Sequence, residues 1–280
     1  MRFFRLLTVL ISVFVSISAR ADAATEIPFA FRSGMIWVDV AVAGQTTPLR
    51  FLLDSGAGKT VLDLGAARRL GVQLGARETV QGVHGRCAAF RVNGLAGTIG
   101  ATPIPRDVLA LDLSAVGANC GGRIDGLLGA DFFREHVVQL DFSLRKIRLL
   151  GRGEINFSAA EILPLSRRGD ALCLRASVNG RAPQWMRLDT GCSGALEWVT
   201  TDAAARGANG VSVAATTGSP ASLRTEVTLG SERISDVKTG LHSQPIFAGE
   251  AGLIGTGLLS QFRVTVDASG SRLLLQRLAK

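Results

Sequence analysis

The sequence predicts a mainly β protein made of two similar lobes, because the second half of the chain repeats the first. The repeat is clearest between GLLGADFFREHVVQLDFSLRKIRL, which begins at Gly126, and GLIGTGLLSQFRVTVDASGSRLLL, which begins at Gly252. The two segments align without a gap and keep apolar or polar character at most positions. A repeat with so long a period indicates two copies of one structural unit that pack together.

Each copy opens with two strands and a turn that lead to an aspartate. The segment IWVDVAVAGQTTPLRFLLDSGA begins at Ile36, and LCLRASVNGRAPQWMRLDTGC begins at Leu172. Apolar residues alternate along the first strand and a glycine-containing turn precedes the second, which is the pattern of a β-hairpin. Both hairpins end in Asp-Ser/Thr-Gly, at Asp54 and Asp189. A short alanine-rich segment of helical character follows each aspartate, at 65–70 and 201–206.

The repeat predicts an N-terminal lobe at 24–152, a linker at 153–164 and a C-terminal lobe at 165–280. Residues 1–23 have the pattern of a secretory signal peptide, with a basic start, an apolar run and the small-x-small site Ala21-Asp22-Ala23. The apolar run is short for a membrane span of roughly 20 residues, which disfavours an uncleaved anchor. We therefore expect an exported protein, periplasmic or secreted, with no stable membrane insertion once the signal is cleaved.

Charge and composition exclude some partners and cofactors. Cleavage of the signal would lower the formal net charge from +8 to +6, since three arginines and one aspartate lie within it. The remaining basic residues are scattered, so they indicate a solvated surface and no nucleic-acid partner. The chain has no Cys-x-x-Cys, and its three histidines are isolated from one another, so we expect no metal site.

The segment FLLDSGAGKT, from Phe51 to Thr60, permits two interpretations. Its Gly-Lys-Thr end is shared with phosphate-binding loops, but such a loop needs a glycine where this chain has Leu53. The second copy has no matching lysine either, so Lys59 is expected to be a solvated side chain. The carboxylate turn Asp-Ser-Gly is weak evidence alone, because it occurs by chance in roughly one chain in ten of this length. Its repetition, followed in both copies by Gly-Leu-(Leu/Ile)-Gly, makes the joint pattern specific.

This joint pattern resembles the pepsin-like and retropepsin-like aspartic peptidases, most closely the bacterial exported proteins with two retropepsin-like lobes in one chain. The resemblance covers nearly all of the sequence after residue 23 and implies two β-barrel lobes with the active-site cleft between them. It implies that Asp54 and Asp189 form the catalytic dyad. Ser55 and Thr190 would tie the two turns together. The residues that support the turns would be Ser55, Gly56, Ala57, Thr190, Gly191 and Cys192.

The chemistry of the family follows from two carboxyl groups a few ångströms apart, which share one proton because both cannot ionise easily. The ionised carboxylate takes a proton from a water that attacks the peptide carbonyl, and the protonated partner donates to the developing oxyanion. The resemblance therefore implies a peptide or protein substrate, no cofactor and no metal. It also implies a monomer, because the second lobe replaces the partner subunit that a single-lobe retropepsin needs.

The resemblance places a substrate-covering flap at Gly82, Val83, His84 and Gly85, where the two glycines would make the tip mobile. The alternative is a plain surface hairpin. The corresponding hairpin of the second copy is expected at 214–227. The chain has no tyrosine, so the flap tyrosine of pepsin-like enzymes is absent, which favours the retropepsin-like type.

Two turn residues depart from the family pattern. Ala57 and Cys192 stand where a hydroxyl could bond the ionised carboxylate and lower its pKa, so we expect a less acidic working pH than that of a digestive pepsin. Four cysteines in an exported chain also indicate disulfides. Four cysteines allow three pairings. If Cys192 pairs with Cys173 on the preceding strand, the disulfide would brace the second turn and leave Cys87 and Cys120 to pair within the first lobe. The alternative is that Cys192 is a free, buried thiol.

The sequence thus predicts an aspartic endopeptidase that hydrolyses peptide bonds with a water activated between two carboxylates. The alternative is a non-catalytic peptide-binding or inhibitor module that kept the cleft. The presence of both Asp54 and Asp189 favours the enzyme. A cell-envelope scaffold is a weaker hypothesis, since it gives no reason for two aspartate turns.

Overall fold

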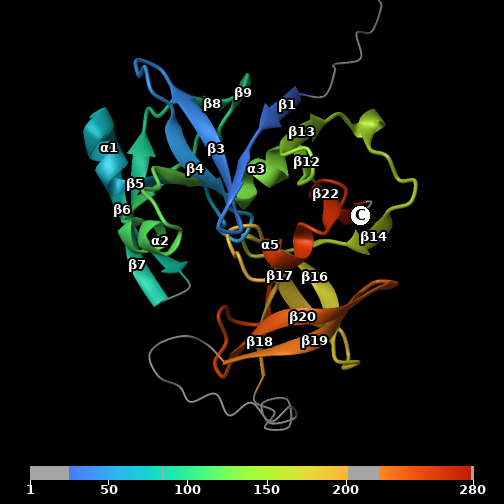
Figure 1. The fold of residues 1–280 in the computed structure, drawn as a ribbon. Helices are drawn as coiled ribbons and strands as arrows, with labels where there is room; N and C mark the ends of the chain where they lie inside the picture. Colours follow the sequence, from blue (N-terminus) through green and yellow to red (C-terminus); the bar gives the residue numbers. More distant parts are fainter. Residues whose placement is uncertain (1–24, 83–84, 201–220, 279–280) are drawn as a thin grey trace, which may run out of the picture.

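The structure is a computed structural model that describes residues 25–82, 85–200 and 221–278. The predicted signal peptide, the alanine-rich segment at 201–206 and the flap residues Val83 and His84 lie outside these ranges. In the described ranges no helix is long and apolar enough to cross a membrane. The described chain is mainly β with short helices, which confirms the predicted fold class (Figure 1).

A six-stranded antiparallel sheet joins the two copies of the repeat. At its centre β12 and β22 pair so that Gln139 lies opposite Thr265, which is its equivalent in the repeat. The two copies are therefore related by an approximate two-fold axis at this pair. In order across the sheet the strands are β1 (Thr25–Pro28), β13 (Lys146–Leu150), β12 (Val137–Asp141), β22 (Phe262–Asp267), β23 (Arg272–Arg277) and β14 (Glu161–Pro164). The range 153–164, predicted as a linker, thus ends in a strand of this sheet, after the 3-10 helix η1 (Arg152–Glu154).

The first lobe is built on a ten-stranded sheet, in which β2 (Ala30–Arg32) pairs with β3 outside the main path. The main path runs β6 (Gln73–Gly82), β7 (Gly85–Asn93), β10 (Leu109–Leu111), β5 (Val61–Asp63), β11 (Gly126–Leu128), β4 (Leu49–Leu53), β3 (Met35–Val42), β8 (Gly97–Ile99) and β9 (Thr102–Pro103). Its helices are α1 (Leu64–Leu70), α2 (Ser114–Asn119) and α3 (Ala130–Glu135).

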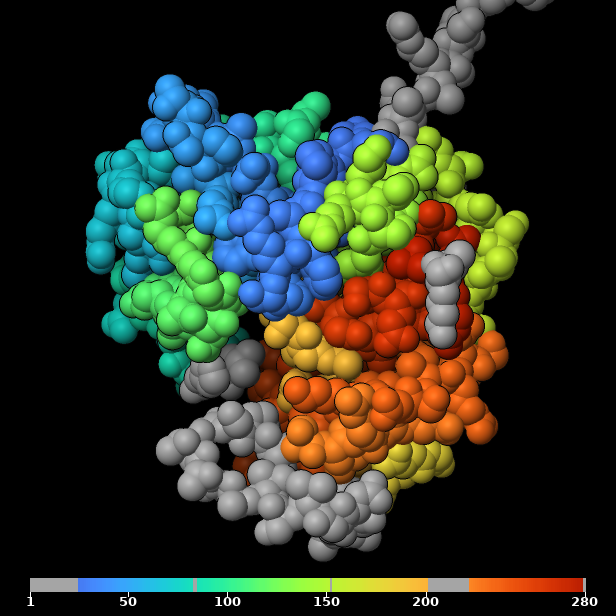
Figure 2. Space-filling view, in the orientation of Figure 1, coloured from blue at the N-terminus to red at the C-terminus, as the bar shows by residue number. Residues whose placement is uncertain are grey.

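The second lobe is built on a seven-stranded sheet, and a further pairing between β16 and β19 curls it into a barrel. The strands run in the order β15 (Ser166–Arg168), β16 (Ala171–Val178), β17 (Gln184–Asp189), β21 (Gly252–Gly255), β18 (Leu196–Val199), β20 (Glu232–His242) and β19 (Ala221–Leu229). The helix α5 (Thr256–Leu259) follows β21. Figure 2 shows the first lobe, blue to green, at the upper left and the orange strands of the second lobe below it.

Local sequence explains why these elements form where they do. In β4, Phe51, Leu52 and Leu53 are all buried, because successive side chains point to opposite faces and both faces are covered by apolar clusters. Helix α1 begins after Asp63, whose carboxylate accepts the N–H of Ala66 at 3.0 Å. The helix ends at Gly71, whose φ of 65° is the left-handed conformation that glycine adopts without strain. β4 is thus buried from Phe51 to Leu53, the residue before Asp54.

Candidate active site

Both candidate aspartates lie where a buried strand meets a parallel neighbour from the Gly-Leu-(Leu/Ile)-Gly segment. β4 pairs with β11 so that Leu53 lies opposite Leu128, and the N–H of Asp54 donates to the carbonyl of Leu128 at 2.9 Å. In the second lobe β17 pairs with β21 in the same way, with Asp189 opposite Gly255. The repeated segment therefore passes beside each aspartate turn and holds its start in place.

The two turns are tied together by reciprocal hydrogen bonds between Ser55 and Thr190. The hydroxyl of each residue accepts the backbone N–H of the other, at 2.9 Å to Thr190 Oγ1 and 3.0 Å to Ser55 Oγ. Each hydroxyl then donates to a carbonyl of the opposite strand: Ser55 to Leu188 and Thr190 to Leu53, both at 2.8 Å. Both side chains are fully buried, so these bonds are shielded from competing water.

The structure places the carboxyl groups of Asp54 and Asp189 next to each other, so that each affects the pKa of the other. Oδ1 of Asp54 also accepts the N–H groups of Gly56 and Ala57, both at 3.0 Å. Oδ1 of Asp189 accepts the N–H of Gly191 at 2.9 Å. The Asp189 side chain is buried, whereas Asp54 is half-buried.

Glycine is required in both turns because each turn packs on the carboxyl group of the other. A Cβ placed on Gly56 would lie 2.4 Å from Oδ1 of Asp189, and one on Gly191 would lie 2.4 Å from Oδ1 of Asp54. Atoms that are not bonded do not approach so closely, so the close contact of the two carboxyl groups depends on these glycines.

Burial controls the protonation of the pair. It raises the pKa of both carboxyl groups above the ordinary aspartate value, because a charge is disfavoured away from water. The negative charge of Asp54 raises the pKa of Asp189 further, whereas the backbone N–H groups and the cation of Arg187 lower both pKa values. The arrangement therefore favours a state in which the pair keeps one proton at pH values where isolated aspartates have lost theirs.

Arg187 is a residue of the site that the sequence interpretation missed. It lies in β17, two residues before Asp189, and is 9% exposed. Its guanidinium makes a two-pronged ion pair with Glu250, at 2.8 and 2.7 Å, and donates a third hydrogen bond to the carbonyl of Gly56 at 2.8 Å. The ring of Phe247 lies 3.4 Å from the guanidinium carbon. The sequence does contain a signal for it, because the equivalent position in the first copy of the repeat holds the apolar residue Leu52.

The residues after the two turns are held by the helices that follow the repeated segment. The carbonyl of Ala57 accepts the N–H of Ala130 at 2.7 Å, and the carbonyl of Cys192 accepts the N–H of Thr256 at 2.9 Å. Burial raises the pKa of the Cys192 thiol, so this thiol stays protonated. Neither side chain donates a hydroxyl hydrogen bond to the dyad.

The prediction of disulfides is wrong, because all four cysteines are free thiols. Cys173 lies opposite Arg187 in the pairing of β16 with β17, whereas Cys192 follows the end of β17. Strand register therefore places Cys173 away from the turn that it was expected to brace. Cys87 is exposed on β7 and Cys120 follows α2, so the first-lobe pair is not formed either.

The predicted flap lies on a hairpin of β6 and β7, in which Gly82 pairs with Gly85. Val83 and His84, at the tip, lie outside the described residues. In the second lobe the described part of the predicted hairpin belongs to β19, which pairs with β20, and residues 214–220 are not described. The described part of the chain therefore shows a hairpin where the flap is predicted, up to the pair of Gly82 and Gly85.

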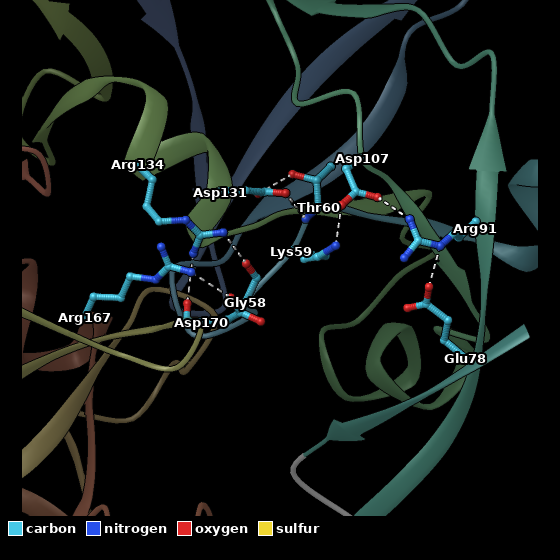
Figure 3. Close-up of polar contacts among 10 residues, drawn as sticks. All are labelled: Gly58, Lys59, Thr60, Glu78, Arg91, Asp107, Asp131, Arg134, Arg167 and Asp170. Carbon is cyan, nitrogen blue, oxygen red and sulfur yellow. Dashed lines mark hydrogen bonds and ion pairs between the residues drawn. The ribbon is translucent and has the colours of Figure 1, made fainter. Parts of the chain in front are cut away.

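The Gly-Lys-Thr end of the first turn has structural contacts (Figure 3). Lys59 forms a surface ion pair with Asp107, in which its side chain stays about one-third exposed to solvent, as expected. Thr60 donates its N–H and its hydroxyl to Asp131, at 2.8 and 2.7 Å. Arg134 donates to the carbonyl of Gly58 at 3.1 Å and to that of Asp170, in the second lobe, at 3.0 Å. These contacts anchor the end of the turn to its own lobe and to the other lobe.

Comparisons with known proteins agree with this geometry. Residues 38–132 match the family model described as Aspartyl protease. Among solved structures the chain is similar to an aspartic proteinase from Irpex lacteus, with 15% identity and a TM-score of 0.63, over 92% of this chain and 98% of that one. A search of curated proteins finds no match. Residues 38–132 thus match the aspartyl protease family, and the chain as a whole has the two-lobed fold of an aspartic proteinase.

Proposed function

We propose that the protein is an aspartic endopeptidase that hydrolyses peptide bonds in proteins or peptides with a water activated between Asp54 and Asp189. The observation that carries the proposal is the contact of two carboxyl groups, one from each lobe, in a setting that raises both pKa values. A pair that keeps one proton contains a base and an acid side by side, which is what hydrolysis of an amide requires.

The reaction needs only these two groups and water. The ionised carboxylate takes a proton from the water as its oxygen bonds to the peptide carbonyl carbon, and the protonated carboxyl gives its proton to the carbonyl oxygen. The C–N bond then breaks as the first carboxyl returns its proton to the leaving nitrogen. The second carboxyl recovers its proton from the hydroxyl of the intermediate, which restores the pair.

Two further properties belong to the proposal. Both carboxyl groups come from a single chain, which supports an enzyme that acts as a monomer. The signal-peptide pattern at residues 1–23 supports export to the periplasm or beyond. Mass spectrometry of the protein recovered from its own cells checks the second property, since cleavage after Ala23 leaves a chain that begins at Ala24.

Incubation of the purified protein with a diverse peptide library tests the function. We expect new peptide termini at defined positions, detected by mass spectrometry, at pH values from about 3 to about 8. The matched control is the double variant Asp54→Asn/Asp189→Asn, which removes both ionisable groups at nearly constant volume. Peptides that bind to the protein without cleavage at any of these pH values would favour the peptide-binding or inhibitor module instead.

A further inference from the structure

The face of the second lobe beneath Asp189 is charged where the same face of the first lobe is apolar. In the first lobe Leu52 pairs with Trp37 across β4 and β3, and Ile124 packs in the same apolar cluster. The corresponding positions of the second lobe hold Arg187, which pairs with Cys173 across β17 and β16, and Glu250. Leu52 and Arg187 each lie two residues before the aspartate of their lobe. Ile124 and Glu250 each lie two residues before the aligned glycines Gly126 and Gly252. The same position is therefore filled by apolar side chains in the first lobe and by an ion pair in the second.

Packing alone does not explain an ion pair in this position. Both side chains are almost fully buried, and a buried ion pair is often no more stabilising than apolar residues of similar volume, because both charges lose their hydration. The first lobe shows that leucine and isoleucine fit the same place. The charged pair thus calls for another explanation, and the third hydrogen bond of Arg187 supplies one.

Arg187 acts across the lobe interface on the peptide unit between Gly56 and Ala57. It donates to the carbonyl oxygen of this unit at 2.8 Å, and the N–H of the same unit donates to Oδ1 of Asp54 at 3.0 Å. A cation bonded to the carbonyl polarises the peptide and strengthens its N–H as a donor, because hydrogen bonds in a chain reinforce one another. The charge of Arg187 is thereby relayed to one oxygen of Asp54.

The two aspartates are not equivalent in this respect. The N–H groups of Ala57 and Cys192 each donate to the main-chain oxygen of their own aspartate at 3.2 Å. The N–H of Ala57 also reaches Oδ1 of Asp54, which thus accepts two turn N–H groups, whereas Oδ1 of Asp189 accepts that of Gly191. In the first lobe the position of Arg187 is taken by Leu52, which has no donor for the turn of the second lobe. The ionised form is therefore better stabilised at Asp54.

We propose that Arg187 is a positioning residue that keeps the shared proton on Asp189 and leaves Asp54 as the base. The inference rests on the proposed function, since it assigns the two roles of that mechanism. Asp54 would accept the proton of the water, and Asp189 would donate its proton to the carbonyl oxygen of the substrate. Arg187 itself touches neither reactant and acts through the Gly56–Ala57 peptide.

Other charged and titratable groups surround Arg187. Glu250 neutralises part of its charge, and Cys173, from β16, lies near both and has its pKa raised to about 12 by burial. Arg168, from β15, adds a second cation near Cys173. On the side of Asp189, Cys192 and Glu197 lie close together. Burial keeps both thiols protonated, so the arginine and glutamate charges dominate the field at the dyad.

The double variant Arg187→Leu/Glu250→Ile tests the inference, since it copies the residues of the first lobe and leaves no lone buried charge. The readout is the titration of ¹³C-labelled aspartate carboxyl groups by NMR, with the dyad signals assigned from Asp54→Asn and Asp189→Asn. We expect the ionisation of Asp54 to move to higher pH by about one pH unit, the effect of losing a nearby cation. Titration curves of both dyad signals that coincide with those of the wild type would overturn the inference.

Two single variants separate this role from a structural one. Arg187→Lys keeps the cation and a donor, and we expect it to restore most of the wild-type titration even where it lowers the melting temperature. If the double variant does not fold, Glu250→Gln tests the inference instead. This substitution removes the negative charge beside Arg187, so the ionisation of Asp54 should move to lower pH. An unchanged titration in Glu250→Gln contradicts the inference. All these titrations need no substrate, so a shift in a protein that cleaves no peptide would sink the proposed function and leave standing only the effect of Arg187 on the protonation of the pair.

Discussion

Ser55 and Thr190 each accept the backbone N–H of the other on their side-chain hydroxyls, across the interface of the two lobes. The two residues occupy the same place in the two copies of the repeat, so the interface is held by a pair of equivalent contacts. Their neighbours, Asp54 and Asp189, are thereby brought into contact. The relation between these hydroxyls and the dyad leads to the first prediction.

We predict that Ser55→Ala lowers the free energy of unfolding by roughly 1–3 kcal/mol, because it leaves the N–H of Thr190 buried without its partner. Thermal or urea unfolding measures the change. Thr190→Ser is the matched control, since it keeps the hydroxyl and loses one methyl group, and it should cost clearly less than Thr190→Ala. Equal losses for these two variants of Thr190 would show that the hydroxyl contributes nothing.

We predict that Gly56→Ala abolishes peptide cleavage, because its Cβ would lie 2.4 Å from the carboxyl of Asp189 and must push the two carboxyl groups apart. Displacement of a catalytic group by about 1 Å can cost about 100-fold in rate, and we expect at least that loss in kcat/KM. Gly153→Ala is the control, because no atom lies within 4 Å of the position of its Cβ. Wild-type kcat/KM in Gly56→Ala would mean that the turns are not packed as described.

The raised pKa of the buried carboxyl groups predicts the pH dependence of cleavage. The pair must keep one proton to act, and burial together with the charge of Asp54 makes Asp189 hold its proton to higher pH. We therefore expect the kcat/KM profile to peak above pH 4, beyond the ordinary aspartate pKa of about 3.9. A profile of kcat/KM that peaks near pH 2 would contradict this prediction. It would also contradict the less acidic working pH expected from the lack of a hydroxyl at Ala57 and Cys192.

The same raised pKa affects stability. Between the unfolded and the folded pKa of Asp189, the folded protein holds a proton that the unfolded chain has lost, so stability is fully present below this window and falls as pH rises through it. Asp189→Asn, which resembles the protonated acid, should lose less stability than the wild type as pH rises from about 4 to neutral. Melting curves over this range check the difference. Parallel curves would show that burial does not perturb Asp189.

The free cysteines give a prediction that separates the structure from the expectation of disulfides. Denatured protein that has not been reduced should show four reactive thiols per chain. In the folded protein Cys87 should react first, because it is exposed, and Cys173 last, because it is buried. A thiol reagent with absorbance readout measures both. No reactive thiols after denaturation would restore the disulfide hypothesis.

The sequence could predict the fold and the two aspartate turns because both depend on short, repeated patterns. The strand leading to Asp54, the turn itself and the Gly-Leu-Leu-Gly segment each have a recognisable local form, and the second copy confirms their register. Arg187 could not be found in this way. Its partners are Glu250, far along the chain, and a carbonyl of the other lobe, so its role appears only once both lobes are assembled.

The wrong expectation of disulfides has a physical origin. An even number of cysteines suggests pairs, but pairing requires a strand register that composition does not contain, and the register sets Cys173 opposite Arg187. The ion pair of Lys59 could not be predicted from the sequence either. Its partner, Asp107, lies outside the motif and is brought near by the fold.

The most direct test of the account compares kcat/KM for one cleaved peptide between the wild type, Asp54→Asn and Asp189→Asn. If the two carboxyl groups act as one acid and base pair, each single variant should lower kcat/KM by at least about 100-fold while its melting temperature stays near that of the wild type. Cleavage at the wild-type rate in either variant would contradict the claim that Asp54 and Asp189 work together.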